Sequence, residues 1–172
     1  TGSPTTGPCL APVVTGGVVT SIDIISSGSG FATTPTLTLT APGGGGSTAT
    51  ATATLTATKS VNDFVTITNA GAGYTDGVYT LVFSGGGGAN AAGTVTVSDG
   101  VVRRVNITNG GDSYTAIPTL SFVGAGSPTT PAVLIAAIGY RIASVTVTDG
   151  GSGYIPDGGT PLVGYATAHY LP

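Results

Sequence analysis

A repeated pattern of strand, glycine turn and aromatic residue constrains this chain more than any other feature. The clearest copies read Val65-Thr-Ile67-Thr-Asn-Ala-Gly71-Ala-Gly73-Tyr74 and Val145-Thr-Val147-Thr-Asp-Gly150-Gly151-Ser-Gly153-Tyr154. Two further copies lead to Phe31 and Tyr114, so that the aromatic residues recur at intervals of about 40 residues, a period typical of repeat folds. The sequence therefore predicts one supersecondary unit that is used about four times.

A second half follows each aromatic residue. In the third copy it reads Pro118-Thr-Leu120-Ser-Phe122, then Gly124-Ala-Gly126, then Ala132-Val-Leu134-Ile-Ala-Ala-Ile138. Segments such as Pro118-Thr-Leu120-Ser-Phe122 and Ala49-Thr-Ala51-Thr-Ala53-Thr-Leu55 alternate apolar residues with Thr or Ser, which indicates strands with one buried and one solvated face. The turn Ser98-Asp99-Gly100 predicts an antiparallel hairpin between the third strand of one copy and the first strand of the next.

We therefore expect an all-β fold of short antiparallel strands in about four repeats of roughly 40 residues, forming a compact sandwich, a β-prism or a short solenoid. The expected repeats cover approximately residues 18–58, 61–98, 101–138 and 142–165. Residues 1–15, which are rich in Pro, are expected to form an extended N-terminal arm, and residues 16–172 a single domain. The chain begins at Thr1, which indicates either a trimmed initiator Met or cleavage of a longer precursor.

The composition favours an assembled protein. Only 6% of the residues are charged, the formal net charge is −3 and the mean hydropathy is +0.41. Charge normally keeps proteins soluble and apart, so we interpret its scarcity as a sign of association with other subunits. Four basic residues are too few for the multiple phosphate contacts of nucleic-acid binding, and no apolar stretch is long enough to span a membrane.

Cys9 is the only cysteine, so no intrachain disulfide can hold the fold together. Its thiol is either an intermolecular bridge or an idle group. The aromatic residues Phe31, Tyr74, Tyr114 and Tyr154 also have two readings. Their rings either close the ends of small sheets or stack on a glycan.

Catalytic chemistry is not predicted. All seven acidic residues are Asp, mostly beside Gly or Asn, where Asp stabilises turns. His169 is the only histidine, and a single His supplies neither a metal cluster nor a catalytic triad. We expect no catalytic, cofactor or metal site.

The unit Val-x-Ile-Thr-Asn-Gly-Gly-x-x-Tyr, followed by Pro-Thr-Leu-x-Phe, a glycine cluster and an Ala/Thr/Val strand, resembles repeats in structural proteins of tailed bacteriophages. Such repeats occur in tail fibres, appendages and capsid-surface proteins, especially of cyanobacterial phages. The resemblance covers approximately residues 18–165. It implies a homo-oligomeric structural protein of a virion, with no catalytic residues, whose partners are copies of itself and other virion proteins.

Two alternatives remain open at this stage. The first is a secreted subunit of an extracellular filament, in which the N-terminal arm adds an edge strand to its neighbour. The second is a glycan-binding adhesin module that uses Tyr74, Tyr114 and Tyr154. All three hypotheses place the protein in a virion or outside the cell.

Overall fold

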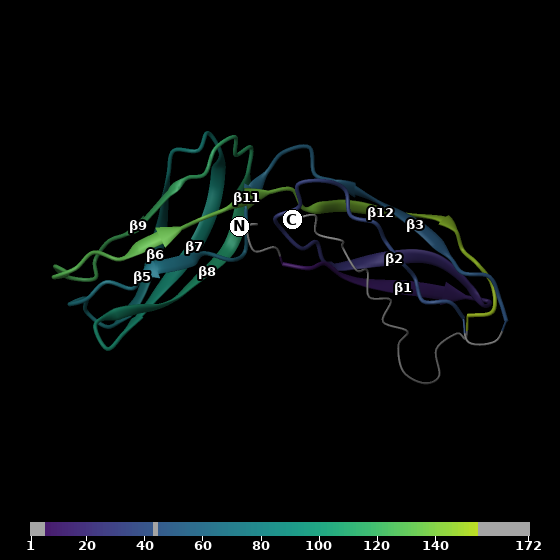
Figure 1. Ribbon diagram of the computed structural model, residues 1–172, viewed down its shortest axis with the longest axis horizontal. Helices are drawn as coiled ribbons and strands as arrows, with labels where there is room; N and C mark the ends of the chain where they lie inside the picture. The colour runs from purple at the N-terminus through teal and green to yellow at the C-terminus, as the bar shows by residue number, and fades with distance from the viewer. Residues whose placement is uncertain (1–5, 43–44, 155–172) are drawn as a thin grey trace. The chain divides into compact units, whose positions relative to one another are not determined.

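The computed structural model describes residues 6–42 and 45–154 and confirms the all-β, antiparallel fold class (Figure 1). The chain forms two compact units, each described by itself. Unit 1 comprises Gly7–Thr56 and the described part of Arg141–Pro172, and unit 2 comprises Ala57–Tyr140. Where the sequence predicts a single domain over 16–172, its two ends thus combine in one unit and its middle forms another.

Unit 2 contains a curled sheet of six strands in the order β5-β10-β9-β6-β7-β8, and a separate pair β11-β4. Its strands are β4 (Ser60–Val61), β5 (Thr66–Asn69), β6 (Gly77–Ser84), β7 (Ala89–Ser98), β8 (Val101–Asp112), β9 (Thr119–Phe122), β10 (Val133–Ile135) and β11 (Ile138–Gly139). The predicted hairpin at Ser98-Asp99-Gly100 is confirmed, because β7 and β8 pair antiparallel on either side of that turn.

The core of unit 2 is a cluster of buried residues on the inner side of the curled sheet. Alternation along the strands directs Leu81, Val95 and Val97 inward and leaves Thr or Ser outward. The curl brings the start of β8 to the turn that follows β5, where the Val102 N–H donates a hydrogen bond to the Ala70 carbonyl. Burial of β-branched residues on one face of a twisted sheet is what the alternating sequence favours.

Unit 1 is built from strands at both ends of the described chain. Its strands are β1 (Cys9–Thr15), β2 (Val18–Ser26), β3 (Thr50–Leu55) and β12 (Ile142–Asp149). β1 pairs with β2 and β12 pairs with β3, both antiparallel. Cys9–Thr15, which the sequence predicts as part of an extended arm, is thus a strand of this unit. The reason is the turn Gly16-Gly17, whose positive φ angles of 59° and 82° suit a tight hairpin.

The two hairpins, β1–β2 and β7–β8, share the same irregularities of register. Each contains two register shifts, at corresponding distances from its glycine turn, and such bulges strengthen the local twist. The shifts lie at Cys9/Leu10 and Val13/Val14 in β1, and at Ala92/Gly93 and Thr96/Val97 in β7. The two units are therefore variations on one strand arrangement.

The turn before the repeated tyrosine is also fixed identically in the two units. In unit 2 the Tyr74 N–H donates to the Gly100 carbonyl at 3.1 Å, and in unit 1 the Tyr154 N–H donates to the Gly17 carbonyl at 3.1 Å. Gly100 and Gly17 each lie in the turn of the unit's β-hairpin. The Gly-x-Gly-Tyr segment is thus anchored to the hairpin turn in each unit.

Candidate functional site: the outer face of unit 2

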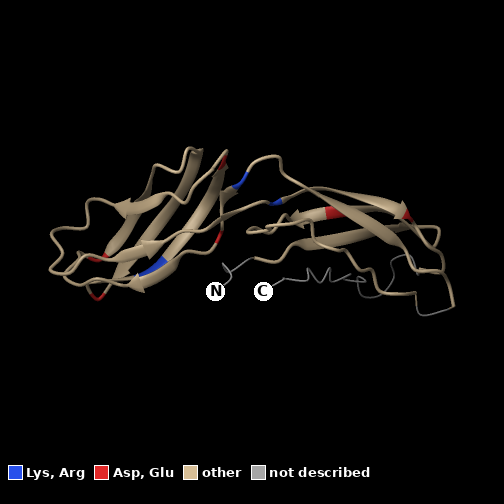
Figure 2. Ribbon diagram, turned by 45° about the horizontal axis from the view of Figure 1, so that its top comes forward, with Lys and Arg blue, Asp and Glu red and all other residues tan. Residues whose placement is uncertain are grey.

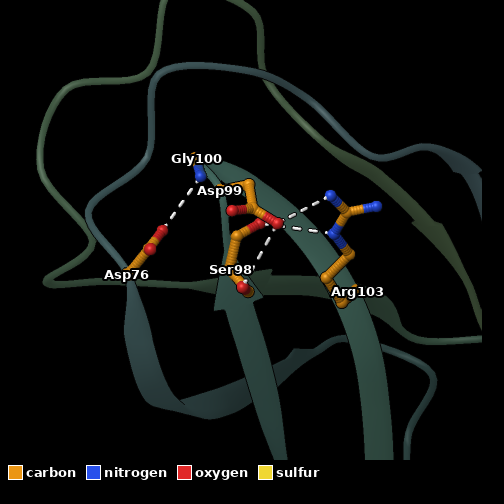
Figure 3. Close-up of polar contacts among 5 residues, drawn as sticks. All are labelled: Asp76, Ser98, Asp99, Gly100 and Arg103. Atoms are coloured by element: carbon orange, nitrogen blue, oxygen red, sulfur yellow. Dashed lines mark hydrogen bonds and ion pairs between the residues drawn. The ribbon is translucent and has the colours of Figure 1, made fainter.

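Two acidic residues, Asp76 and Asp99, take part in polar contacts at the β7–β8 turn, which Figure 3 shows in detail. The Asp76 carboxylate accepts a hydrogen bond from the Gly100 N–H at 2.9 Å, and Arg103 forms an ion pair with Asp99 at 3.0 Å. Asp99 has a φ of 56°, a conformation that Asp tolerates better than most residues. These contacts stabilise a hairpin turn, and the exposed ion pair adds at most about 1 kcal/mol.

The described residues contain no group of three or more His, Cys, Asp or Glu side chains that could hold a metal ion. They also contain no helix that is long and apolar enough to cross a membrane. His169 lies outside the described residues.

Two of the four aromatic residues singled out by the sequence make equivalent contacts through their hydroxyl groups. The Tyr74 hydroxyl accepts a hydrogen bond from the Ala132 N–H at 2.8 Å, and the Tyr154 hydroxyl accepts one from the Ala49 N–H at 2.8 Å. The Tyr154 hydroxyl also lies 3.2 Å from the Thr40 carbonyl, to which it donates. These tyrosines join the glycine turn to a strand that is distant in the sequence.

The aromatic rings lie largely inside the units. Phe31, Tyr114 and Tyr154 are buried, whereas Tyr74 is half-buried and packs against Phe122 with 5.1 Å between the ring centroids. Burial raises the pKa of the Tyr114 hydroxyl, and the charge of Asp112 raises that pKa further. Stacking on a glycan requires a free ring face, which the packing of the three buried rings does not leave.

Cys9 is an exposed free thiol at the beginning of β1, where it pairs with Ser26 of β2. Its side chain is accessible to solvent. An intermolecular bridge through this thiol stays a prediction.

The outward side of the unit 2 sheet forms a surface that the sequence analysis did not single out, here called the outer face. Alternation and the cross-strand pairs Val82–Ser121 and Ile135–Thr119 place its residues on one side. The outer face consists of Thr66, Thr68, Val78, Thr80, Val82, Ser84, Thr94, Thr96, Thr119, Ser121, Val133 and Ile135. None of these residues is charged.

Four of these residues are large, apolar and exposed. Val78 is 67% exposed, Ile135 49%, Val133 47% and Val82 37%. Arg104, which pairs with Thr96, is the first charged residue at the β8 edge, and Figure 2 shows charged residues as a few scattered positions on the ribbon. Exposed apolar patches bordered by polar residues are typical of interaction surfaces.

One signal for this surface was present in the sequence. In Leu81-Val82-Phe83 and Val133-Leu134-Ile135 the apolar residues run without alternation, so each strand has an apolar residue on both faces. The outer face could therefore have been found from these two strands. Its continuity across the sheet depends on strand order, which the sequence did not predict.

Comparison of this chain with family models, with curated proteins and with solved structures found no match.

Proposed function

We propose that this protein is a non-enzymatic structural subunit that acts as one of many identical copies in a virion of a tailed phage. The observation that carries the assembly role is the uncharged outer face of unit 2, with four exposed Val and Ile side chains. Burial of such side chains between subunits stabilises association by about 25 cal/mol for each Å² removed from water. The resemblance of the repeats to phage structural proteins supports the virion as the location.

A sheet face without charge suits contacts between identical subunits. It brings no like charges together when two copies meet, and its Thr hydroxyls can hydrogen-bond at the rim of the contact. A second copy of the chain is therefore the partner that we assign to the outer face.

The filament alternative depends on a free N-terminal arm, and the pairing of β1 weakens it. It requires the N-terminal arm to leave its own subunit, yet Cys9–Thr15 pairs with Val18–Ser26 inside unit 1. Strand donation by the arm would have to use the residues before Cys9 or break the hairpin.

The assembly role is tested by measuring the association of the full chain over a range of concentrations, by light scattering or sedimentation. The substitutions Val78→Lys and Ile135→Lys introduce charge on the outer face, and we expect each to weaken association at least about tenfold, equivalent to about 1.4 kcal/mol. Ile25→Lys is the matched control, because Ile25 is 68% exposed on β2 of unit 1. Equal association of all three variants and the wild type would refute the role of the outer face.

The location is tested separately by electron microscopy of the native particle with antibody labelling of this chain. Label on a capsid or tail is the expected result. Label on free polymers, with none on virions, would instead favour the filament.

A further inference from the structure

One face of the strand pair β3–β12 in unit 1 carries exposed threonines at alternate positions. Between them along β3 lie Ala51 and Ala53, which are half-buried and buried, and Val147 of β12 packs against the buried cluster of this unit. Threonine and apolar residues therefore occupy opposite faces. Six exposed residues on the threonine side form what we call the threonine array: Thr36, Thr50, Thr52, Thr54, Thr146 and Thr148.

The threonine array is arranged in rows across neighbouring segments of the sheet. Thr52 pairs with Thr146 of β12 on one side and forms a bridge with Thr36 on the other. The adjacent row contains Thr50 and Thr148, whose hydroxyl oxygens lie 2.7 Å apart. Neighbouring strands lie about 4.8 Å apart, and alternate residues of one strand about 6.7 Å apart. The array thus presents hydroxyl and methyl groups at two regular spacings.

The strand arrangement does not itself require threonine in this array. Ala49 of unit 1 and Ala132 of unit 2 are equivalent, because each donates its N–H to the hydroxyl group of the repeated tyrosine. Thr52 therefore corresponds to Ile135, which is also exposed. Because an apolar residue occupies the same place in unit 2, the fold alone does not account for the hydroxyl group of Thr52.

The chemistry of the threonine array narrows the partner that it fits. The array carries no charge, so an ionic partner gains nothing from it. Thr and Ser are under-represented among the residues that dominate binding between proteins, and the array offers no aromatic ring on which a sugar could stack. A Thr hydroxyl group supplies one hydrogen-bond donor and two acceptor positions, which suit water, and an ordered water bridges such groups at little enthalpic cost. A regular array of hydroxyl groups therefore fits water that is itself regularly ordered.

The spacings of the threonine array are close to those of ice. In ice each water molecule forms four tetrahedral hydrogen bonds of about 2.75 Å, so second neighbours lie about 4.5 Å apart and the lattice repeats about every 7.3 Å along its hexagonal axis. These distances differ from the two spacings of the array by about 0.3 and 0.6 Å. Sheet twist rotates neighbouring strands by about 20–25°, so such a match extends over only a few segments, and the row through Thr52 spans three.

We propose that the threonine array of unit 1 binds the surface of ice, through waters that its hydroxyl groups hold in positions compatible with the crystal lattice. Each hydroxyl group contributes little by itself, but several contacts on one sheet face act together once the first has formed. A crystal cannot grow where the chain is adsorbed. The array lies in unit 1 and needs no second copy, so this inference does not rest on the proposed function.

The test is inhibition of ice recrystallisation by the full chain. Frozen solutions are held just below the melting point over a range of protein concentrations, and crystal size is followed by microscopy. We expect the wild type to keep the crystals small. Thr52→Lys places a long charged side chain in the central row and should raise the protein concentration needed at least about tenfold. Ser21→Lys is the matched control, because Ser21 is exposed on β2 of the same unit, outside the array, and we expect it to act like the wild type.

A second variant and a second surface complete the test. Thr146→Lys changes the same row from β12 and should have the same effect as Thr52→Lys, while hydrogen exchange in β3 verifies that both variants keep the fold of unit 1. The proposal is overturned if the wild type fails to inhibit recrystallisation up to its solubility limit, or if both variants inhibit as well as the wild type. Adsorption of the wild type to crystalline cellulose but not to ice would also overturn it and would identify a neutral polysaccharide as the partner.

The result is separable from the proposed function. Val78→Lys acts on the outer face of unit 2 and leaves the threonine array untouched, so we expect this variant to inhibit recrystallisation as the wild type does. Loss of association in Val78→Lys with unchanged inhibition bears on the assembly role alone. Loss of inhibition in Thr52→Lys with unchanged association bears on the threonine array alone.

Discussion

The Tyr154 hydroxyl accepts a hydrogen bond at 2.8 Å from the N–H of Ala49, a residue more than one hundred positions earlier in the chain. This bond joins the C-terminal Gly-x-Gly-Tyr turn to the start of β3. Both residues are buried, so water cannot replace either partner. The Tyr74 hydroxyl accepts the equivalent bond from the Ala132 N–H, so the contact gives the tyrosine after the Gly-x-Gly turn the same role in both units.

Removal of this hydroxyl should destabilise unit 1. Tyr154→Phe keeps the ring but leaves the buried Ala49 N–H without an acceptor, which costs about 1–3 kcal/mol. The measurement is chemical denaturation of the full chain, with hydrogen exchange in β3 to identify the unit affected. Tyr140→Phe is the control, since the described residues show no hydrogen bond from the Tyr140 hydroxyl and its ring contact with Lys59 would be kept. An equal loss in the two variants would contradict the role of the Tyr154–Ala49 bond.

Two glycines of unit 2 should differ in their tolerance of a side chain. Gly71 and Gly85 both have positive φ, 70° and 77°, so alanine at either site costs about 1–2 kcal/mol of backbone strain. A Cβ at Gly71 would lie 2.6 Å from Cε2 of Tyr74 and 2.7 Å from the Thr130 carbonyl oxygen, whereas a Cβ at Gly85 meets nothing within 4 Å.

We therefore expect Gly71→Ala to lose about 1–3 kcal/mol more free energy of unfolding than Gly85→Ala, because of the added overpacking. Thermal or denaturant unfolding of the two variants side by side measures the difference. If Gly71→Ala and Gly85→Ala lost the same free energy of unfolding, the positive φ alone would account for glycine at position 71. The close approach of Tyr74 would then have no effect on stability.

Strands and turns close together in the sequence could be predicted, and distant pairings could not. The hairpin at Ser98-Asp99-Gly100 followed from local turn chemistry, and the structure confirms it. The pairing of Val147 with Ala51 joins segments at opposite ends of the chain. Alternating Val, Ala and Thr residues fit many partners equally well, so the sequence pattern did not distinguish this pairing from others.

The candidate site was likewise predictable only in its local features. The apolar residues of β6 and β10 are visible in the sequence, but they form one surface only because β9 lies between these strands. The strand β1 was missed because Pro12 suggested an arm. Proline is tolerated in strands at positions where its missing N–H breaks no ladder bond, so Pro12 did not exclude a strand.

Asn62 is a buried residue that the sequence did not single out. It is fully buried, and within residues 6–42 and 45–154 its side-chain amide nitrogen and oxygen have no hydrogen-bond partner. Burial of an amide without partners is costly, so Asn62→Leu, which keeps a similar volume, should stabilise the protein by about 1–3 kcal/mol. The midpoint of denaturation should rise accordingly.

Asn62→Asp is the matched opposite change. It introduces a charge at the same buried position and should destabilise the fold strongly near neutral pH. A loss of stability in Asn62→Leu would show that the amide group has a stabilising role and would contradict this interpretation.

Tyr114 should make the stability of unit 2 sensitive to alkaline pH. Burial, and then the charge of Asp112, raise the pKa of this hydroxyl above its ordinary value of 10.0 in the folded chain. Above that ordinary value the unfolded chain loses the proton first, so the folded state binds more protons. The free energy of unfolding therefore falls as pH rises from about 10 through the folded pKa, while the full stabilisation is present below pH 10.

Tyr114→Phe removes the titrating group and keeps the ring in its packing against Gly88, whose hypothetical Cβ would meet the ring. We expect the variant to lose less free energy of unfolding than the wild type between about pH 9 and pH 11.5. Denaturant titrations across that range measure the two slopes. Asp112→Asn removes only the second cause, so its slope should lie between the other two. Identical slopes for the wild type and Tyr114→Phe would mean that the hydroxyl ionises equally well in the folded and unfolded chains, and burial of Tyr114 would then have no effect on its titration.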